Sequence, residues 1–251
     1  MGTAATTVER SSGARRRLRK SPFFTILGLV MLLLAIGGFW PQYFSAVAGG
    51  TPTPTTRFWL IHLHTALFTG WLLLYIWQAA LIITGRARVH LKLGPWLAAY
   101  GFVIAAVGVY AAGLLAHRRG VRETDLDVAA SFVFFPLIDM VYFAGFLTAA
   151  VVYRKIPHLH KRAMLLATFS IAVVGIGRLV GQTGFESALV WQPLNLAPVL
   201  IAIAYDIFVC RKVYAVMAVG LVVHLFRLNA DPFANSEVWL PVGRALVAPF
   251  G

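Results

Sequence analysis

Residues 22–40 read PFFTILGLVMLLLAIGGFW, an apolar run that contains no charged side chain. A helix needs about 20 mostly apolar residues to cross the hydrocarbon core of a bilayer. A strand of a membrane barrel needs only about 10 residues, in which polar and apolar side chains alternate. The run is too long and too uniformly apolar for a barrel strand, so it predicts a membrane-spanning helix.

Six further stretches share this apolar character. The seven predicted spans are 22–40, 58–84, 95–116, 128–153, 163–182, 190–210 and 213–229. We therefore expect an all-α integral membrane bundle of seven transmembrane helices, which forms one domain over residues 22–229. A tail, 1–21, precedes this domain, and an outer tail, 230–251, follows it. Prolines predict an extended loop at 41–57, and Trp239 predicts an interfacial segment in the outer tail.

The composition of the whole chain agrees with a membrane protein. Of its 251 residues, 59% are hydrophobic and only 12% are charged, whereas a soluble globular domain carries about 25% charged residues. These values exclude a disordered, collagen-like or coiled-coil chain and argue against a soluble enzyme. The single cysteine, Cys210, excludes an internal disulfide.

The formal charge of +13 is distributed unevenly along the chain. Nearly all of the excess lysine and arginine lies in the tail 1–21 and in loops around Arg86, Arg154 and Arg211, which alternation through seven spans places on one side. Because basic loops stay in the cytoplasm, we expect a cytoplasmic N-terminus and an external C-terminus. Attraction to anionic lipids at the cytoplasmic face accounts for the charge without a nucleic acid partner.

The first span has a second interpretation. A basic tail, an apolar run and the small residues Ala46-Val47-Ala48 resemble a secretory signal with its cleavage site. The apolar run is longer than the usual 7–15 residues of such a signal, which favours an uncleaved first helix. Cleavage would leave six spans.

Three charged residues lie well inside the predicted spans, away from their ends: Asp139, Arg178 and Asp206. Such groups are costly in a bilayer and mark either a functional site or a buried structural pair. Asp139 and Arg178 lie at similar depths on two spans joined by a short loop, so we expect an ion pair or shared network between them. Asp206 belongs to a polar stripe that predicts either a transport path or an interhelical contact.

Histidines near the outer ends of two spans form a candidate cofactor site. His64 shares a helical face with polar and aromatic residues and is expected to face the bundle interior, although His62 is an alternative. His224 lies at the same predicted depth on the seventh span. The two could ligate a haem or a transition metal, with Arg227 beside a haem propionate, or could be structural histidines. The cytoplasmic loop residues His90, His158 and His160 are interpreted as interfacial.

Two stretches resemble a pattern found in uncharacterised multi-pass membrane proteins of bacteria. The first consists of His62-Leu63-His64, Trp71, Gln78, Gly85-Arg86 and His90-Leu91-Lys92-Leu93-Gly94. The second consists of Tyr153-Arg154-Lys155-Ile156-Pro157, His160-Lys161-Arg162-Ala163-Met164-Leu165-Leu166-Ala167-Thr168 and Ile176-Gly177-Arg178. The resemblance covers about residues 60–180 and departs at Lys92, where these proteins have arginine, and at Ala163, where they have leucine.

That resemblance implies a multi-pass protein of the bacterial cytoplasmic (inner) membrane and no particular activity. In layout alone, with histidines on both sides of a helical bundle, the chain is also similar to dihaem cytochrome-b membrane oxidoreductases. Three function classes follow. They are a non-catalytic accessory or assembly-type membrane factor, a haem- or metal-binding redox protein that uses His64 and His224, and a transporter with a polar path through Asp139, Arg178 and Asp206.

Overall fold

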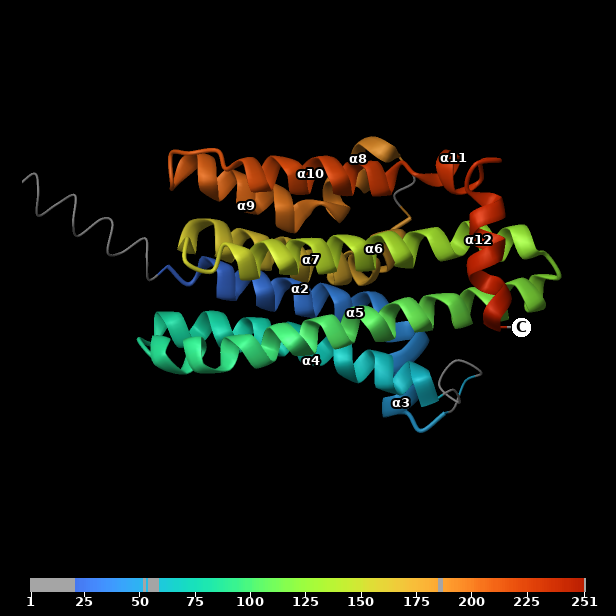
Figure 1. The fold of residues 1–251 in the computed structure, drawn as a ribbon, viewed down its shortest axis with the longest axis horizontal. Helices are drawn as coiled ribbons and strands as arrows, with labels where there is room; N and C mark the ends of the chain where they lie inside the picture. Colours follow the sequence, from blue (N-terminus) through green and yellow to red (C-terminus); the bar gives the residue numbers. More distant parts are fainter. Residues whose placement is uncertain (1–20, 52, 54–58, 185–186, 251) are drawn as a thin grey trace, which may run out of the picture.

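The computed structural model describes residues 21–51, 53, 59–184 and 187–250 and is almost entirely helical over them, with no strand in these ranges (Figure 1). In chain order the elements are α2 (Phe23–Phe39), the π-helical turn η1 (Trp40–Phe44), α3 (Ser45–Ala48), α4 (Trp59–Ile83), α5 (Ala87–Glu123), α6 (Leu126–Val152), α7 (Pro157–Gly181), α8 (Ala188–Asn195), α9 (Ala197–Phe208), α10 (Ala215–Leu228), α11 (Asp231–Ala234), α12 (Leu240–Val247) and η2 (Ala248–Phe250). The predicted tail 1–21 lies almost wholly outside the described residues.

Five helices are long and apolar enough to cross a membrane: Phe23–Ala48, which continues α2 through η1 and α3, and α4, α5, α6 and α7. A sixth span is formed if α8 and α9 are taken together, although they are bent by 71° at their junction. The last predicted span, 213–229, corresponds to α10, which is only 14 residues long. The structure thus confirms an all-helical bundle with several helices able to span a membrane.

The long helices run side by side, and α7 is the most deeply buried of them (Figure 1). We call the end of the bundle where α2 begins the proximal end. It also holds the α4–α5 turn, the α6–α7 turn and the α9–α10 link (Figure 1). The opposite, distal end holds the α5–α6 turn with α11 and α12. Helices α9 and α10 lie on one side of α6 and α7, and α4 lies on the other side.

Two glycines bring α2 directly against α7. A Cβ atom on Gly175 would lie 2.7 Å from the Cα atom of Ala35, and one on Gly38 would collide with the backbone oxygen of Gly175. The backbones of the two helices therefore touch where both sequences have glycine. Close approach through small residues is a common way of packing helices in membranes, where lipid is as apolar as a leucine side chain.

Several predicted boundaries were wrong at the ends of spans. Residues 41–48 are helical rather than extended, and Pro41 lies in the π-helical turn η1, which continues α2. Helix α5 begins at Ala87 and passes through Pro95, whereas a loop was expected before 95. At 37 residues it is about 55 Å long, so its polar ends project beyond a hydrocarbon core of about 30 Å.

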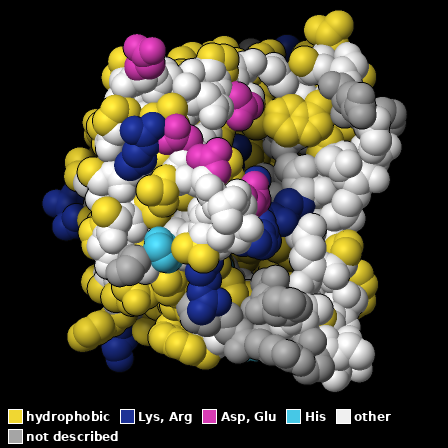
Figure 2. All heavy atoms as spheres, turned by 90° about the vertical axis from the view of Figure 1, so that its right-hand side faces the viewer, with side chains coloured by type: hydrophobic (Ala, Val, Ile, Leu, Met, Phe, Trp, Pro, Cys, Tyr) yellow, Lys and Arg dark blue, Asp and Glu magenta, His cyan; other side chains and the backbone are white. Residues whose placement is uncertain are grey.

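The C-terminal segment 230–250 packs against the rest of the bundle. Helix α12 lies across the α5–α6 hairpin at the distal end (Figure 1), and the half-buried Trp239 donates from Nε1 to the backbone oxygen of Ala130 at 2.7 Å. Arg244 donates from Nη2 to Oδ2 of Asp127 at 2.8 Å. Figure 2 looks onto this end and shows acidic and basic side chains intermixed.

Candidate functional site

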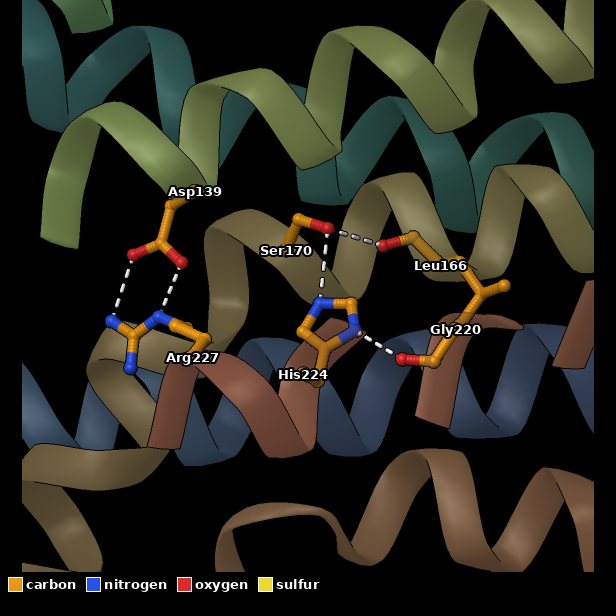
Figure 3. Close-up of polar contacts among 6 residues, drawn as sticks. All are labelled: Asp139, Leu166, Ser170, Gly220, His224 and Arg227. Carbon is orange, nitrogen blue, oxygen red and sulfur yellow. Dashed lines mark hydrogen bonds and ion pairs between the residues drawn. The ribbon is translucent and has the colours of Figure 1, made fainter. Parts of the chain in front are cut away.

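One group of buried polar side chains lies where α10 meets α6 and α7 (Figure 3). His224 on α10 is fully buried. Its Nδ1 lies 2.7 Å from the backbone oxygen of Gly220, and its Nε2 lies 3.2 Å from Oγ of Ser170 on α7. Since a carbonyl oxygen only accepts, the proton of a neutral ring sits on Nδ1. Nε2 then accepts from the Ser170 hydroxyl, which has the backbone oxygen of Leu166 at 2.9 Å as its alternative acceptor.

Aromatic side chains enclose the His224 ring. The rings of Phe169, Tyr142 and Phe146 have their centroids 4.7, 5.4 and 6.1 Å away. All three belong to α6 or α7. The imidazole is thus held by hydrogen bonds at both nitrogens and by aromatic contacts from two helices, as expected of a histidine that fixes one helix against its neighbours.

Asp139 lies one helical turn further toward the distal end and pairs with Arg227 of α10 (Figure 3). Nη2 of Arg227 lies 2.8 Å from Oδ2 of Asp139, and Nε contacts Oδ1. The carboxylate is fully buried, whereas the Arg227 side chain keeps 13% of its surface exposed. This two-point contact fixes both the depth and the rotation of α10.

The predicted ion pair between Asp139 and Arg178 was therefore wrong about the partner. Arg178 lies in the last turn of α7, is largely exposed and donates to Oε1 of Gln42 at 2.7 Å. Depth along a helix can be counted from the sequence, but the direction in which a side chain points around the axis depends on packing. The two residues lie on neighbouring helices, and Arg178 faces the end of α2 instead of α6.

A second buried ion pair lies at the proximal end, between Arg162 of α7 and Asp206 of α9. Arg162 donates from Nε to Oδ2 of Asp206 at 2.7 Å, contacts Oδ1 through Nη2, and donates from Nη1 to the backbone oxygen of His158 at 2.8 Å. The ring of Tyr214 covers the guanidinium at 3.6 Å, and only 1% of the Arg162 side chain is exposed. The guanidinium of Arg162 and the carboxylate of Asp206 therefore neutralise each other.

The sequence interpretation placed Arg162 in a loop and so missed its role. Helix α7 starts at Pro157, which occupies the first helical position, where proline is favoured. Extending the helix back to this proline puts Arg162 on the same face as Leu166, four residues on. That spacing was the available signal for a buried arginine.

The structure does not bring His64 and His224 together. His64 on α4 stacks on Phe68 with ring centroids 4.0 Å apart, and its Nδ1 is buried without a hydrogen-bond partner. Helices α4 and α10 lie on opposite sides of α6 and α7 (Figure 1). His62 is exposed, and its Nδ1 lies 2.8 Å from the hydroxyl of Tyr43. Among the described residues, no three His, Cys, Asp or Glu side chains are grouped to hold a metal ion.

No family model, curated protein or solved structure matches this chain. The resemblance to uncharacterised bacterial membrane proteins therefore stays an expectation that rests on the sequence pattern.

Proposed function

We propose that this chain is a seven-span protein of the bacterial cytoplasmic membrane that acts as a non-catalytic accessory or assembly-type factor. One observation carries the proposal. Asp139 and Asp206, which could have marked a polar path, are each held by a separate arginine that ties α9 or α10 to the central helices. Arg178 lies apart from both, on Gln42. Three separate contacts favour interhelical connections over a continuous path.

The orientation that we propose has the proximal end in the cytoplasm. The turns at this end carry arginine and lysine and no acid over 84–94, 153–162 and 209–214, whereas the acids of the distal end balance its arginines. Basic segments are retained in the cytoplasm and attract anionic lipids. The seventh span would be α10, with its ends completed by residues on either side.

Reporter fusions test the topology. An enzyme that is active only outside the cytoplasm, fused after Asn235, is expected to be active, and the same enzyme fused after Arg154 is expected to be inactive. The opposite pattern, or a cytoplasmic C-terminus, would overturn the seven-span arrangement.

A deletion strain tests the function itself. We expect one membrane complex to be less abundant on native gels and to be restored by the wild-type chain. The double variant Arg162→Met/Asp206→Leu should restore it as well, because a connection between helices needs complementary packing rather than charge. Failure of a well-expressed double variant would show that these charges act in chemistry or transport and would contradict the proposal.

The second candidate, a haem-binding redox protein, is favoured by the unpartnered Nδ1 of His64. An absorption spectrum of the protein purified in mild detergent distinguishes the two candidates. A Soret band that is lost in His64→Ala would support the redox protein. The accessory factor is expected to show no such band.

A further inference from the structure

Two histidines interpreted as separate loop residues meet at the proximal end. His90 lies in the first turns of α5 and His160 lies in the first turn of α7. Their ring centroids are 6.1 Å apart, with the rings nearly perpendicular at 81°. The α4–α5 hairpin and the α6–α7 hairpin thus each contribute one imidazole to the same place.

Each imidazole keeps one ring nitrogen available for a ligand. Nδ1 of His160 lies 2.8 Å from the backbone oxygen of Ala150, so this nitrogen carries the proton and Nε2 keeps its lone pair. Nδ1 of His90 is buried without a hydrogen-bond partner, whereas His160 has one ring nitrogen hydrogen-bonded and the other free. Metal-bound histidines almost always have this arrangement, in which the second ring nitrogen is hydrogen-bonded to a carbonyl or carboxylate.

Further unpartnered polar atoms belong to α4. Both amide atoms of Gln78 are buried without a hydrogen bond, and so is the hydroxyl of Tyr75 one turn earlier. Buried polar side-chain atoms nearly always have a partner, so a group of exceptions indicates a bound water or ion. Most of the unpartnered buried side-chain atoms of the described chain belong to Tyr75, Gln78 and His90.

We propose that His90 and His160 bind one divalent transition-metal ion through their free nitrogens, with Oε1 of Gln78 as a third ligand. Two imidazoles bound to one ion at about 2.1 Å hold their ring centroids roughly 5–6.5 Å apart, depending on the angle at the metal. The observed 6.1 Å falls within this range. The ion would join the α4–α5 hairpin to the α6–α7 hairpin.

The ligand set also selects the kind of ion. Imidazole nitrogen suits Zn²⁺, Co²⁺ and Ni²⁺, whereas Mg²⁺ and Ca²⁺ require carboxylates and other oxygens. The turns at 84–94 and 153–162 contain no acid and several arginines and lysines. A hard cation is therefore excluded from this place, while neutral imidazoles can still bind a borderline metal.

Metal binding to the full-length protein tests the proposal. The chain is purified in mild detergent through a tag without histidine, treated with a chelator and loaded with Zn²⁺ at pH 7.5. We expect one Zn²⁺ per chain after desalting and no gain with Mg²⁺. With Co²⁺ we expect visible absorption bands of nitrogen coordination, a readout that requires no variant.

Variants locate the ion. His90→Ala and His160→Ala should each weaken Zn²⁺ binding by about tenfold or more, and Gln78→Leu should weaken it by less. His117→Ala, at the distal end of α5, is the matched control and should bind as the wild type does. Zn²⁺ retained by both His90→Ala and His160→Ala, or no retention by the wild type, would overturn the proposal and leave ordered water as the partner of these atoms.

Discussion

Helices α2 and α10 are attached to the centre of the bundle in different ways. Helix α2 lies backbone to backbone on α7 at Gly38 and Gly175. Helix α10 is held at three positions by side chains, through His224 and Arg227 and, beside the α9–α10 link, through the stacking of Tyr214 on Arg162. The contact of α2 with α7 depends on the close approach of two backbones, whereas the contacts of α10 depend on polar side chains.

The difference follows from length and position. Apolar burial gives little attraction between helices in lipid, so close van der Waals contact or hydrogen bonds must hold them together. The helical segment Phe23–Ala48 is long enough to cross the bilayer, and its part α2 packs along α7. Helix α10 has only 14 residues, and specific pairs define its register with α6 and α7.

The largest expected effect comes from unpairing the proximal ion pair. Replacing Arg162 by methionine leaves Asp206 buried without a partner, which should lower the free energy of unfolding by about 3–5 kcal/mol. Asp206→Leu should cost a similar amount. Unfolding in a titration of denaturing detergent, followed by circular dichroism, measures both.

The double variant Arg162→Met/Asp206→Leu sharpens this result. The double variant removes both charges and replaces the two side chains by apolar ones. Its free energy of unfolding should therefore lie within about 1 kcal/mol of that of the wild type. A double variant as unstable as the single variants would mean that the guanidinium acts through Tyr214 and His158 rather than through Asp206.

The two residues of the proximal ion pair differ in how well the sequence predicts them. Asp206 was identified from hydropathy alone as an acid within a span, which marks either a functional site or a structural contact. Arg162 was not, because arginines at a helix end usually extend to water and are counted as loop residues. The sequence predicts which helices exist, and the structure adds which faces meet.

The second largest expected effect comes from disturbing the contact between α2 and α7. Gly38→Ala places a methyl group on the backbone of Gly175, so the helices must separate, at a cost of about 2–3 kcal/mol. The matched control is Gly145→Ala on α6, where the added Cβ meets no atom within 4 Å. Thermal unfolding in detergent should show a lower midpoint for the first variant and an equal or higher one for the second.

The same glycines show a second limit of prediction. The apolar run 22–40 predicted a helix, and the structure describes α2 there. Nothing in the run distinguishes Gly38, which touches α7, from Gly37, where an added Cβ would meet Leu179 at an ordinary 3.5 Å. That difference depends on the rotation of one helix against the other, which the packing of all side chains determines.

The smallest expected effect concerns the ion pair between Asp139 and Arg227. It tests which arginine is the partner of Asp139. A double-mutant cycle of Asp139→Asn with Arg227→Gln should give a coupling energy of about 1–2 kcal/mol. The cycle of Asp139→Asn with Arg178→Gln should give nearly none, because Arg178 donates to Gln42. A larger coupling in the second cycle would restore the partner predicted from depth alone.

This coupling should be weaker than that of Arg162 with Asp206 for a reason visible in the exposure of the arginines. The Arg162 side chain is 1% exposed, whereas that of Arg227 is 13% exposed and lies in the last turn of α10. A guanidinium near a helix end can extend toward water when its partner is lost, which reduces the cost of the unpaired charge. Comparing the coupling energy of Arg162 with Asp206 and that of Asp139 with Arg227 therefore shows how much more deeply the first pair is buried.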